Sequence, residues 1–155
     1  FQRTCSPAVE PITENNIGDV RDFLDIWCDW KDCDSDPMLA NEKEAVLFGL
    51  SHKIELQLSG LSIRVDGKIG AMALFERLNE DTALVHFEKG LPECKGIYRA
   101  INAETAKLLS SDYVYINRES DMGVEGIREA KMRYHPDHMV EVNFIKRESS
   151  TFPIL

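Results

Sequence analysis

The feature that most constrains the fold is a change in hydrophobic period along the chain, from about 3.6 residues to two and back again. Apolar residues recur at spacings of three and four over residues 17–31, which is typical of an amphipathic helix. Over 61–65 they alternate with polar residues, and an Asp-Gly pair typical of a tight hairpin follows. Return strands over 69–78 and 82–88 complete a predicted antiparallel meander.

The remaining elements follow from prolines, caps and shorter apolar runs. Two prolines within residues 7–16 exclude a central strand and favour an edge strand, and Asn16 is suited to cap the first helix. Asn41, with Glu44 three residues later, resembles the capping box that begins a second helix. The pattern also predicts a helix over 95–109, a strand over 113–116, a helix over 124–133 and a last strand over 140–145.

The passage from residue 82 to 116 is long enough for a right-handed parallel crossover, so the sheet should be mixed. A mixed, mostly antiparallel sheet of this order, flanked by helices, resembles the acyl-CoA N-acyltransferase-like (GNAT) fold, of class α/β (α+β). In that fold, the strands near 82–88 and 113–116 should run parallel and then diverge, with the donor's acyl group in the gap. The expected boundaries are a linker and edge strand over 1–16, one GNAT-like domain over 17–148 and a C-terminal tail over 149–155.

The distribution of charge limits which partners can bind this chain. The net charge is −9, and residues 1–88 carry all the excess acidity, with 8 Lys and Arg against 17 Asp and Glu. A polyanion must therefore be met by a local cluster of cations.

The four cysteines have no regular spacing, which predicts reduced thiols in a bacterial-type cytoplasm. The longest apolar run, over 69–75, is far too short for the roughly 18 residues of a membrane-spanning helix, so none is expected.

The segment from Tyr115 to Pro136 carries the densest group of polar residues, at the end of a predicted strand where sheets of this kind bind ligands. Asn117–Gly123 reads Asn-Arg-Glu-Ser-Asp-Met-Gly, and 126–131 reads Gly-Ile-Arg-Glu-Ala-Lys before a Tyr-His-Pro. With Glu-Lys at 88–89 and Lys-Gly-Ile-Tyr-Arg-Ala-Ile-Asn at 95–102, these motifs resemble the phosphatidylglycerol lysyltransferase C-terminal-like domain family. From spacing alone, a salt-bridged loop followed by a solvated helix face explains these residues as well as a functional site does.

The resemblance covers residues 17–146 and relates the chain to enzymes that move an aminoacyl group from aminoacyl-tRNA to a lipid headgroup. Family members commonly carry two GNAT-like halves, and this sequence resembles the second. We therefore expect a fragment of a longer protein, with a preceding GNAT-like half or a second copy as partner, and a tRNA as a further one. A coenzyme A thioester is the alternative donor, and no resident cofactor is expected. The loop over 90–96 lacks the glycine pattern that acetyltransferases use for coenzyme A.

Candidate site residues follow from transfer chemistry, which needs a base for the nucleophile's proton and cations or N–H groups for phosphate and oxyanion. Glu88 or Glu119 is the candidate base, and Tyr134 could return a proton to the leaving group. The candidate donor- and substrate-binding residues are Lys89, Lys95, Gly96, Tyr98, Asn102, Asn117, Arg118, Asp121, Arg128 and Lys131.

No metal site is expected. The acidic run at 32–36 has Pro37 where a calcium loop needs Gly, and His135 and His138 have no third ligand nearby. The alternative to a transferase is a non-catalytic regulatory or interaction domain that retains the fold.

Overall fold

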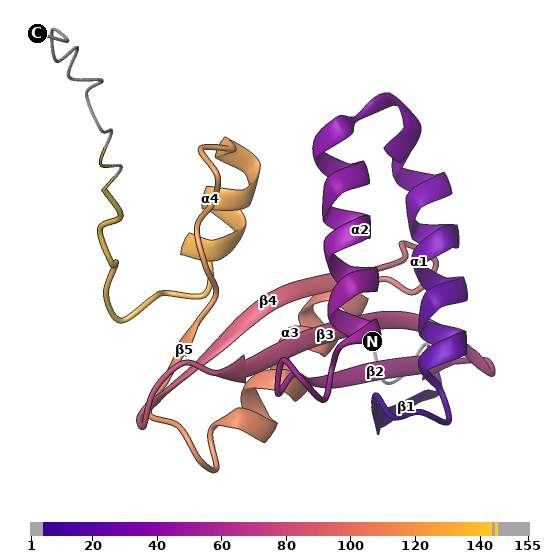
Figure 1. Cartoon of the computed structure of the whole chain (residues 1–155), viewed down its shortest axis with the longest axis horizontal. Coiled ribbons are helices and arrows are strands. Elements are labelled where there is room, and N and C mark those ends of the chain that lie inside the picture. The colour runs from indigo at the N-terminus through magenta and orange to yellow at the C-terminus, as the bar shows by residue number, and fades with distance from the viewer. Residues whose placement is uncertain (1–4, 144, 146–155) are drawn as a thin grey trace, which may run out of the picture. The chain divides into compact units, whose positions relative to one another are not determined.

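The computed structural model describes residues 5–143 and 145, and the chain divides into two compact units, Phe1–Glu119 and Ser120–Leu155. The first unit contains a five-stranded sheet in the order β1-β2-β3-β4-β5 (Figure 1). Its strands are β1 (Pro7–Pro11), β2 (Ser59–Val65), β3 (Lys68–Arg77), β4 (Thr82–Gly90) and β5 (Tyr115–Asn117). Its helices are α1 (Ile17–Lys31), the short 3₁₀ helix η1 (Cys33–Ser35), α2 (Pro37–Ser51) and α3 (Ile97–Leu109), and the second unit contains α4 (Glu125–Met132).

The mixed sheet predicted from the sequence is confirmed. Strands β1 to β4 pair as antiparallel neighbours, and β5 pairs with β4 in parallel. The β2–β3 hairpin turns at Asp66 and Gly67, whose φ angles of 50° and 81° are both positive, as a type I′ turn requires. The change of hydrophobic period therefore marked a real meander followed by a real crossover.

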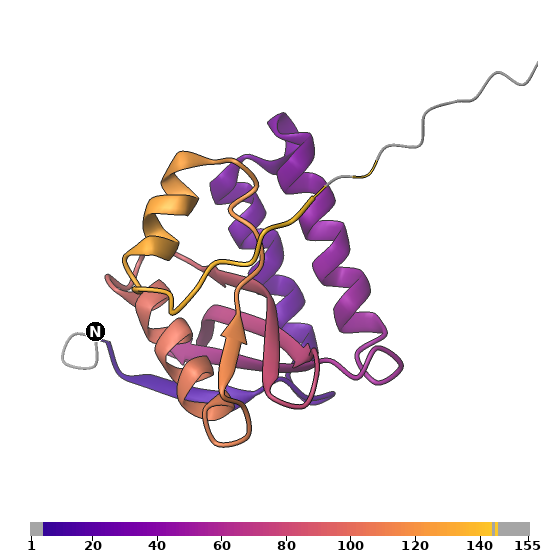
Figure 2. The same ribbon diagram turned by 90° about the vertical axis from the view of Figure 1, so that its left-hand side faces the viewer.

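Helices cover both faces of this sheet. α1 and α2 lie on one face and α3 lies on the other, which Figure 2 shows with the sheet between them. The stripe on α1 predicted from the spacing of three and four is buried against β3, and its members are Val20, Phe23, Leu24 and Trp27. Each such side chain stabilises the fold by about 1.5–3 kcal/mol through removal of apolar surface from water.

Strands β4 and β5 separate soon after they begin to pair, as the sequence predicted. Their parallel register runs only from Thr82 opposite Tyr115 to Leu84 opposite Asn117, while β4 continues to Gly90. A β-bulge occurs on β4 just past this point, because Leu74 and Phe75 on β3 face Phe87 and Val85. His86 is thus the extra residue of β4 and has no Cα partner between these two fully described strands.

Two helix starts differ from the sequence prediction. α2 begins at Pro37 rather than near Asn41, because Asp36 accepts from the backbone N–H groups of Met38 and Leu39 at 2.9 and 3.4 Å. An Asp cap followed by proline at the first helical position is a strong helix start. Asn16 precedes α1 as predicted, but its side-chain oxygen accepts from the Thr13 N–H instead of capping the helix.

The prediction of reduced thiols is wrong in this structure. All four cysteines lie in the described part and pair as Cys5–Cys94 and Cys28–Cys33, with Cα–Cα distances of 6.4 and 5.1 Å. Irregular spacing hid the pairing because the first pair is separated by 89 residues and meets only when the sheet forms.

The predicted last strand over 140–145 is also wrong for its described residues, since 140–143 and 145 adopt no strand. Residue 144 lies outside the described residues. A strand exists only through hydrogen bonds to a neighbour, which apolar alternation cannot supply by itself. Among the helices that the structure describes, none has the length and hydropathy needed to cross a membrane.

Candidate functional site at the separation of β4 and β5

Glu88, the first candidate base, lies beside the gap between β4 and β5 and is held from two sides. One carboxylate oxygen accepts from the Asn102 amide on α3 at 3.0 Å, and the other forms an ion pair with Arg118, just after β5. The Glu88 side chain is only 11% exposed. The structure thus brings together three of the residues that the sequence singled out, on one face of the sheet.

Glu119, the second candidate base, lies across the same gap. Its φ of 56° is in the left-handed region, and its backbone N–H donates to the Asn117 side chain at 2.8 Å. Its carboxylate lies 2.7 Å from the Nδ1 atom of His86, whose Nε2 atom is 3.0 Å from the carboxylate of Glu76 on β3. The Glu119 side chain is 45% exposed, so solutes can reach it.

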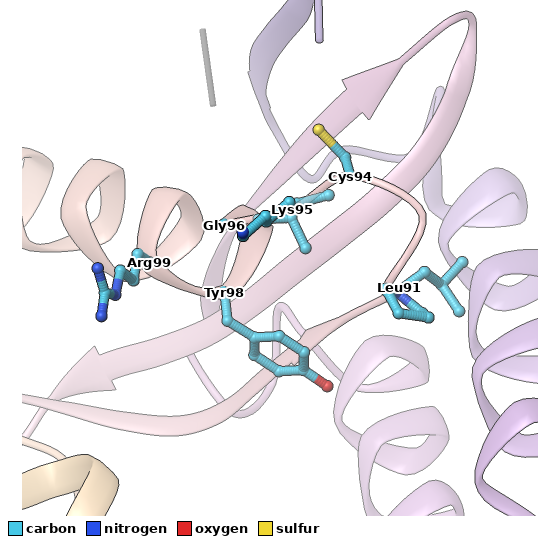
Figure 3. Close-up of a pocket in the computed structure, with 8 residues that line it drawn as sticks. Leu91, Cys94, Lys95, Gly96, Tyr98 and Arg99 are labelled. Carbon is cyan, nitrogen blue, oxygen red and sulfur yellow. The ribbon is translucent and has the colours of Figure 1, made fainter. Parts of the chain in front are cut away.

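A hollow of about 420 Å³ lies at the start of α3. Figure 3 shows Lys95, Gly96 and Tyr98 on its wall, and the remaining lining residues are Leu91, Pro92, Cys94, Ile97 and Arg99. Gly96 has a φ of 94° and precedes the helix, and no described side chain caps its N–H groups. The Ile97 N–H donates to the Cys94 carbonyl oxygen at 3.1 Å. The positive end of the helix and the cations Lys95 and Arg99 make this wall suited to an anion. The Cys5–Cys94 disulfide ties the loop that forms it to the segment before β1.

Lys89 lies away from Glu88, because neighbouring residues of a strand project to opposite faces of a sheet. Its side chain is 1% exposed, and its ammonium is 2.9 Å from the Glu42 carboxylate of α2 and 3.7 Å from the ring centre of Trp27. Burial lowers the pKa of Lys89, against the opposing effect of Glu42. The Trp27 indole N–H in turn donates to the Tyr98 hydroxyl at 3.4 Å. Lys89, predicted to bind donor, is thus enclosed by protein.

The second unit contains the last part of the polar motif. Asp121 accepts from the Arg128 guanidinium and from the Gly123 N–H, and Lys131 donates to the Ser120 carbonyl oxygen at 2.7 Å. The Arg128 guanidinium lowers the pKa of Asp121, and the carboxylate raises that of Arg128. Tyr134 follows α4 and is exposed. The predicted convergence of Arg128 and Lys131 with Lys95 and Arg118 involves both units and stays a prediction.

Three charged residues of this region were not singled out as site residues by the sequence analysis: His86, Glu76 and Glu42. His86 lies two residues before the Glu-Lys pair at 88–89, but nothing in the sequence marked it as the extra residue of a bulge. Glu42 lies in the predicted second helix, where nothing marked it as the partner of a buried lysine. No group of three or more potential metal ligands occurs among the residues that the structure describes.

Comparison with solved structures gives the fold a context. A conserved protein of unknown function from Bacteroides thetaiotaomicron is 36% identical, with a TM-score of 0.85 over 90% of this chain and 47% of its own. The present chain thus spans about half the length of that protein. A ribosomal-protein-alanine N-acetyltransferase from Brucella melitensis biovar Abortus has a TM-score of 0.61 at 13% identity, covering 92% of this chain and 99% of its own. An aminoglycoside N-acetyltransferase in complex with CoA has a TM-score of 0.57 at 13% identity, and the match covers 96% of this chain and 99% of its own.

Because the two acetyltransferases share only 13% identity with this chain, they establish that it has the GNAT fold and establish nothing about its activity. No curated protein sequence matches the chain. The family model for the C-terminal part of phosphatidylglycerol lysyltransferase, however, matches residues 1–144, which include the sheet, α3 and the polar motif. This chain therefore belongs to the phosphatidylglycerol lysyltransferase C-terminal family, and it is an acyltransferase-like domain with the GNAT fold.

Proposed function

We propose that this chain transfers an acyl or aminoacyl group from a phosphate-bearing donor, an acyl-coenzyme A or an aminoacyl-tRNA, to a nucleophilic acceptor. The observation that carries the proposal is the parallel β4–β5 pair, which separates after Leu84 and Asn117 beside two carboxylates. A gap of this kind can admit the donor's acyl group between the strands. The hollow at the start of α3 lies at the end of β4, where the donor's phosphates would follow.

The proposed chemistry assigns a role to each part of the site. Lys95 and the positive end of α3 attract the donor's phosphates. Glu88 or Glu119 accepts the proton of the acceptor nucleophile as its bond to the acyl carbon forms. The donor's thioester or ester bond breaks in the same transfer, and Tyr134 supplies the proton that the leaving group needs. Arg118, Arg128 and Lys131 neutralise further phosphate charge.

The alternative is a non-catalytic interaction domain, and one observation favours it. Each proposed phosphate-binding cation outside the hollow already has a protein partner: Arg118 pairs with Glu88, Arg128 pairs with Asp121, and Lys131 binds a carbonyl oxygen. A domain of that kind would use these contacts for stability alone. Substitution of any of the three would then lower the melting temperature and change no ligand affinity.

A titration separates these two functions. The chain is titrated with acetyl-coenzyme A and with lysyl-tRNA, and the titrations are repeated with Lys95→Ala and with the control Lys68→Ala, an exposed lysine on the β2–β3 hairpin. Loss of one charge-assisted hydrogen bond is worth about 1.5–3 kcal/mol, so Lys95→Ala should weaken donor binding by roughly 10- to 150-fold. Lys68→Ala should bind donor as the original chain does. Absence of saturable binding of both donors would contradict the transferase proposal.

A further inference from the structure

A histidine with a carboxylate on each side lies at the point where β4 and β5 separate. We propose that His86 is the positioning residue of the transfer site, fixed by Glu76 and holding Glu119 as the base that accepts the acceptor's proton. This inference rests on the proposed transferase function and goes beyond it, because it selects one of two candidate bases and assigns a role to two residues of the sheet.

The position of His86 is set by the bulge. Because His86 is the extra residue of β4, its backbone has no Cα partner on β3. It lies two residues beyond Leu84, the last residue of β4 that pairs with β5, and Glu119 lies two residues beyond the matching Asn117. The His86–Glu119 contact of 2.7 Å therefore crosses the gap at its narrow end. Bulges that direct a side chain in this way are common beside active sites.

The two contacts also fix the orientation of the ring. Glu119, just after β5, lies at Nδ1 and Glu76 of β3 lies at Nε2, so a carboxylate faces each nitrogen of His86. The imidazole is therefore held at both of its polar atoms, and it holds the Glu119 carboxylate in turn.

Accessibility distinguishes Glu119 from Glu88. Glu88 is almost completely covered, and both of its oxygens are engaged by Asn102 and Arg118. Glu119 is nearly half exposed on the same gap. Its left-handed backbone is unfavourable for a residue with a Cβ atom, and the Asn117 side chain and His86 hold it there. Strained backbone held by its surroundings is typical of functional positions.

The proposed step balances without further reactants. The acceptor nucleophile forms its bond to the donor's acyl carbon and releases its proton to the Glu119 carboxylate, while the bond from that carbon to the donor's sulfur or oxygen breaks. The leaving group takes its proton from Tyr134 or water. His86 gains and loses no proton during transfer; it fixes the direction of Glu119, and Glu76 fixes the ring. Base and orienting groups arranged in this way are common in enzymes that activate a nucleophile.

The test combines single-turnover rates, donor titrations and nuclear magnetic resonance on the chain. His86→Ala should lower the rate of transfer from acetyl-coenzyme A by roughly 10- to 100-fold, a part of the 10²- to 10⁴-fold that acid–base catalysis supplies. Its donor dissociation constant should change by less than about twofold, because His86 touches no donor in the proposal. Added imidazole should restore part of the rate, which a purely structural role would not allow.

Variants of Glu76 and Glu119 test whether these residues act together with His86, and a variant of a distant histidine serves as the control. Glu76→Gln keeps an oxygen that accepts from Nε2 and should retain more activity than Glu76→Ala. Residues that act as one unit are non-additive, so His86→Ala combined with Glu119→Gln should be no slower than Glu119→Gln alone. His52→Ala, which removes a histidine stacked on Phe48 of α2, should leave the transfer rate unchanged.

The outcomes separate this inference from the function on which it rests. Saturable donor binding and transfer by the original chain, with an equal rate in folded His86→Ala, would overturn the inference and leave the transferase function standing. No binding and no transfer would overturn both. If His86→Ala fails to fold, the ¹⁵N resonances of the His86 ring decide independently of activity. They should shift in Glu76→Gln and in Glu119→Gln, and resonances that stay unchanged in both variants would refute the proposed arrangement.

Discussion

The buried ion pair between Lys89 and Glu42 supports the sharpest stability prediction. Lys89 is 1% exposed and Glu42 is 37% exposed. Loss of Glu42 therefore leaves a buried charge without its partner, whereas loss of Lys89 leaves a charge that water can solvate. Glu42→Ala leaves a buried ammonium with the Trp27 ring as its remaining attractive contact among those described here. Breaking a buried pair from one side costs about 3–5 kcal/mol, and we expect about 3 kcal/mol because water can reach the Glu42 side.

Lys89→Met should behave in the opposite way. It removes the buried charge and keeps a side chain of similar length, and such replacements are often neutral or stabilising by about 1–4 kcal/mol. Glu42 is then left alone at a position where water can solvate it. The double variant should therefore recover most of the stability that Glu42→Ala loses. In a chain of this size, a loss of 3 kcal/mol corresponds to a fall in Tm of about 6–12 °C.

Urea unfolding of the two single variants and the double variant forms a complete thermodynamic cycle. Lys43→Met is the matched control, because Lys43 pairs with Asp25 at a similar distance of 2.7 Å but at the surface, where such pairs contribute about 1 kcal/mol or less. If Lys89→Met destabilises the chain as much as Glu42→Ala does, attraction outweighs desolvation and our reasoning is refuted. A loss below about 1 kcal/mol for Glu42→Ala would also refute it.

Three further predictions concern stability. Burial lowers the pKa of Lys89 below 10.5, so between the lowered pKa and pH 10.5 the unfolded chain binds more protons than the folded chain. Urea midpoints should therefore rise with pH over that range in the original chain, and this rise should be absent in Lys89→Met. Cys5→Ser removes the disulfide that closes a loop with a separation of 89 residues and should lower the free energy of unfolding by about 4–5 kcal/mol. Cys28→Ser removes one with a separation of 5 and should lower it by about 2 kcal/mol, and equal losses in urea unfolding would contradict the loop-entropy reasoning. Asp36→Ala removes the α2 cap and should lower stability by about 1 kcal/mol, measured as a Tm about 2–4 °C lower; an unchanged Tm would show that Pro37 alone starts the helix.

The sequence predicted those parts of the fold that depend on local periodicity. Alternation over β2 and the Asp66-Gly67 pair located the first hairpin, and the segment between β4 and β5 was long enough for a crossover. Both signals are physical properties of short segments, and tertiary contacts did not override them. The start of α2 was also readable, because Asp36 followed by Pro37 is a capping signal, but the acidic run was considered only as a failed calcium loop.

Features that join distant segments could not be predicted in the same way. The Cys5–Cys94 and Lys89–Glu42 contacts each require two elements to be in place before the partners meet. Lys89 belongs to one of the motifs, yet a motif gives no information about which face of a sheet a lysine occupies. The bulge on β4 decides that face, because one extra residue reverses the alternation of all side chains beyond it.

The same bulge explains why the candidate base was ambiguous in the sequence. A regular strand would place Glu88 on the same face as His86 and Leu84, since all three are an even number of residues apart. The extra residue at His86 instead leaves His86 with Glu76 and Glu119 and turns Glu88 toward Asn102 on α3. One inserted residue thus separates two carboxylates that the sequence could not distinguish, enclosing Glu88 and leaving Glu119 accessible. A site of this kind depends on strand register, which becomes visible only when β3 and β4 are paired.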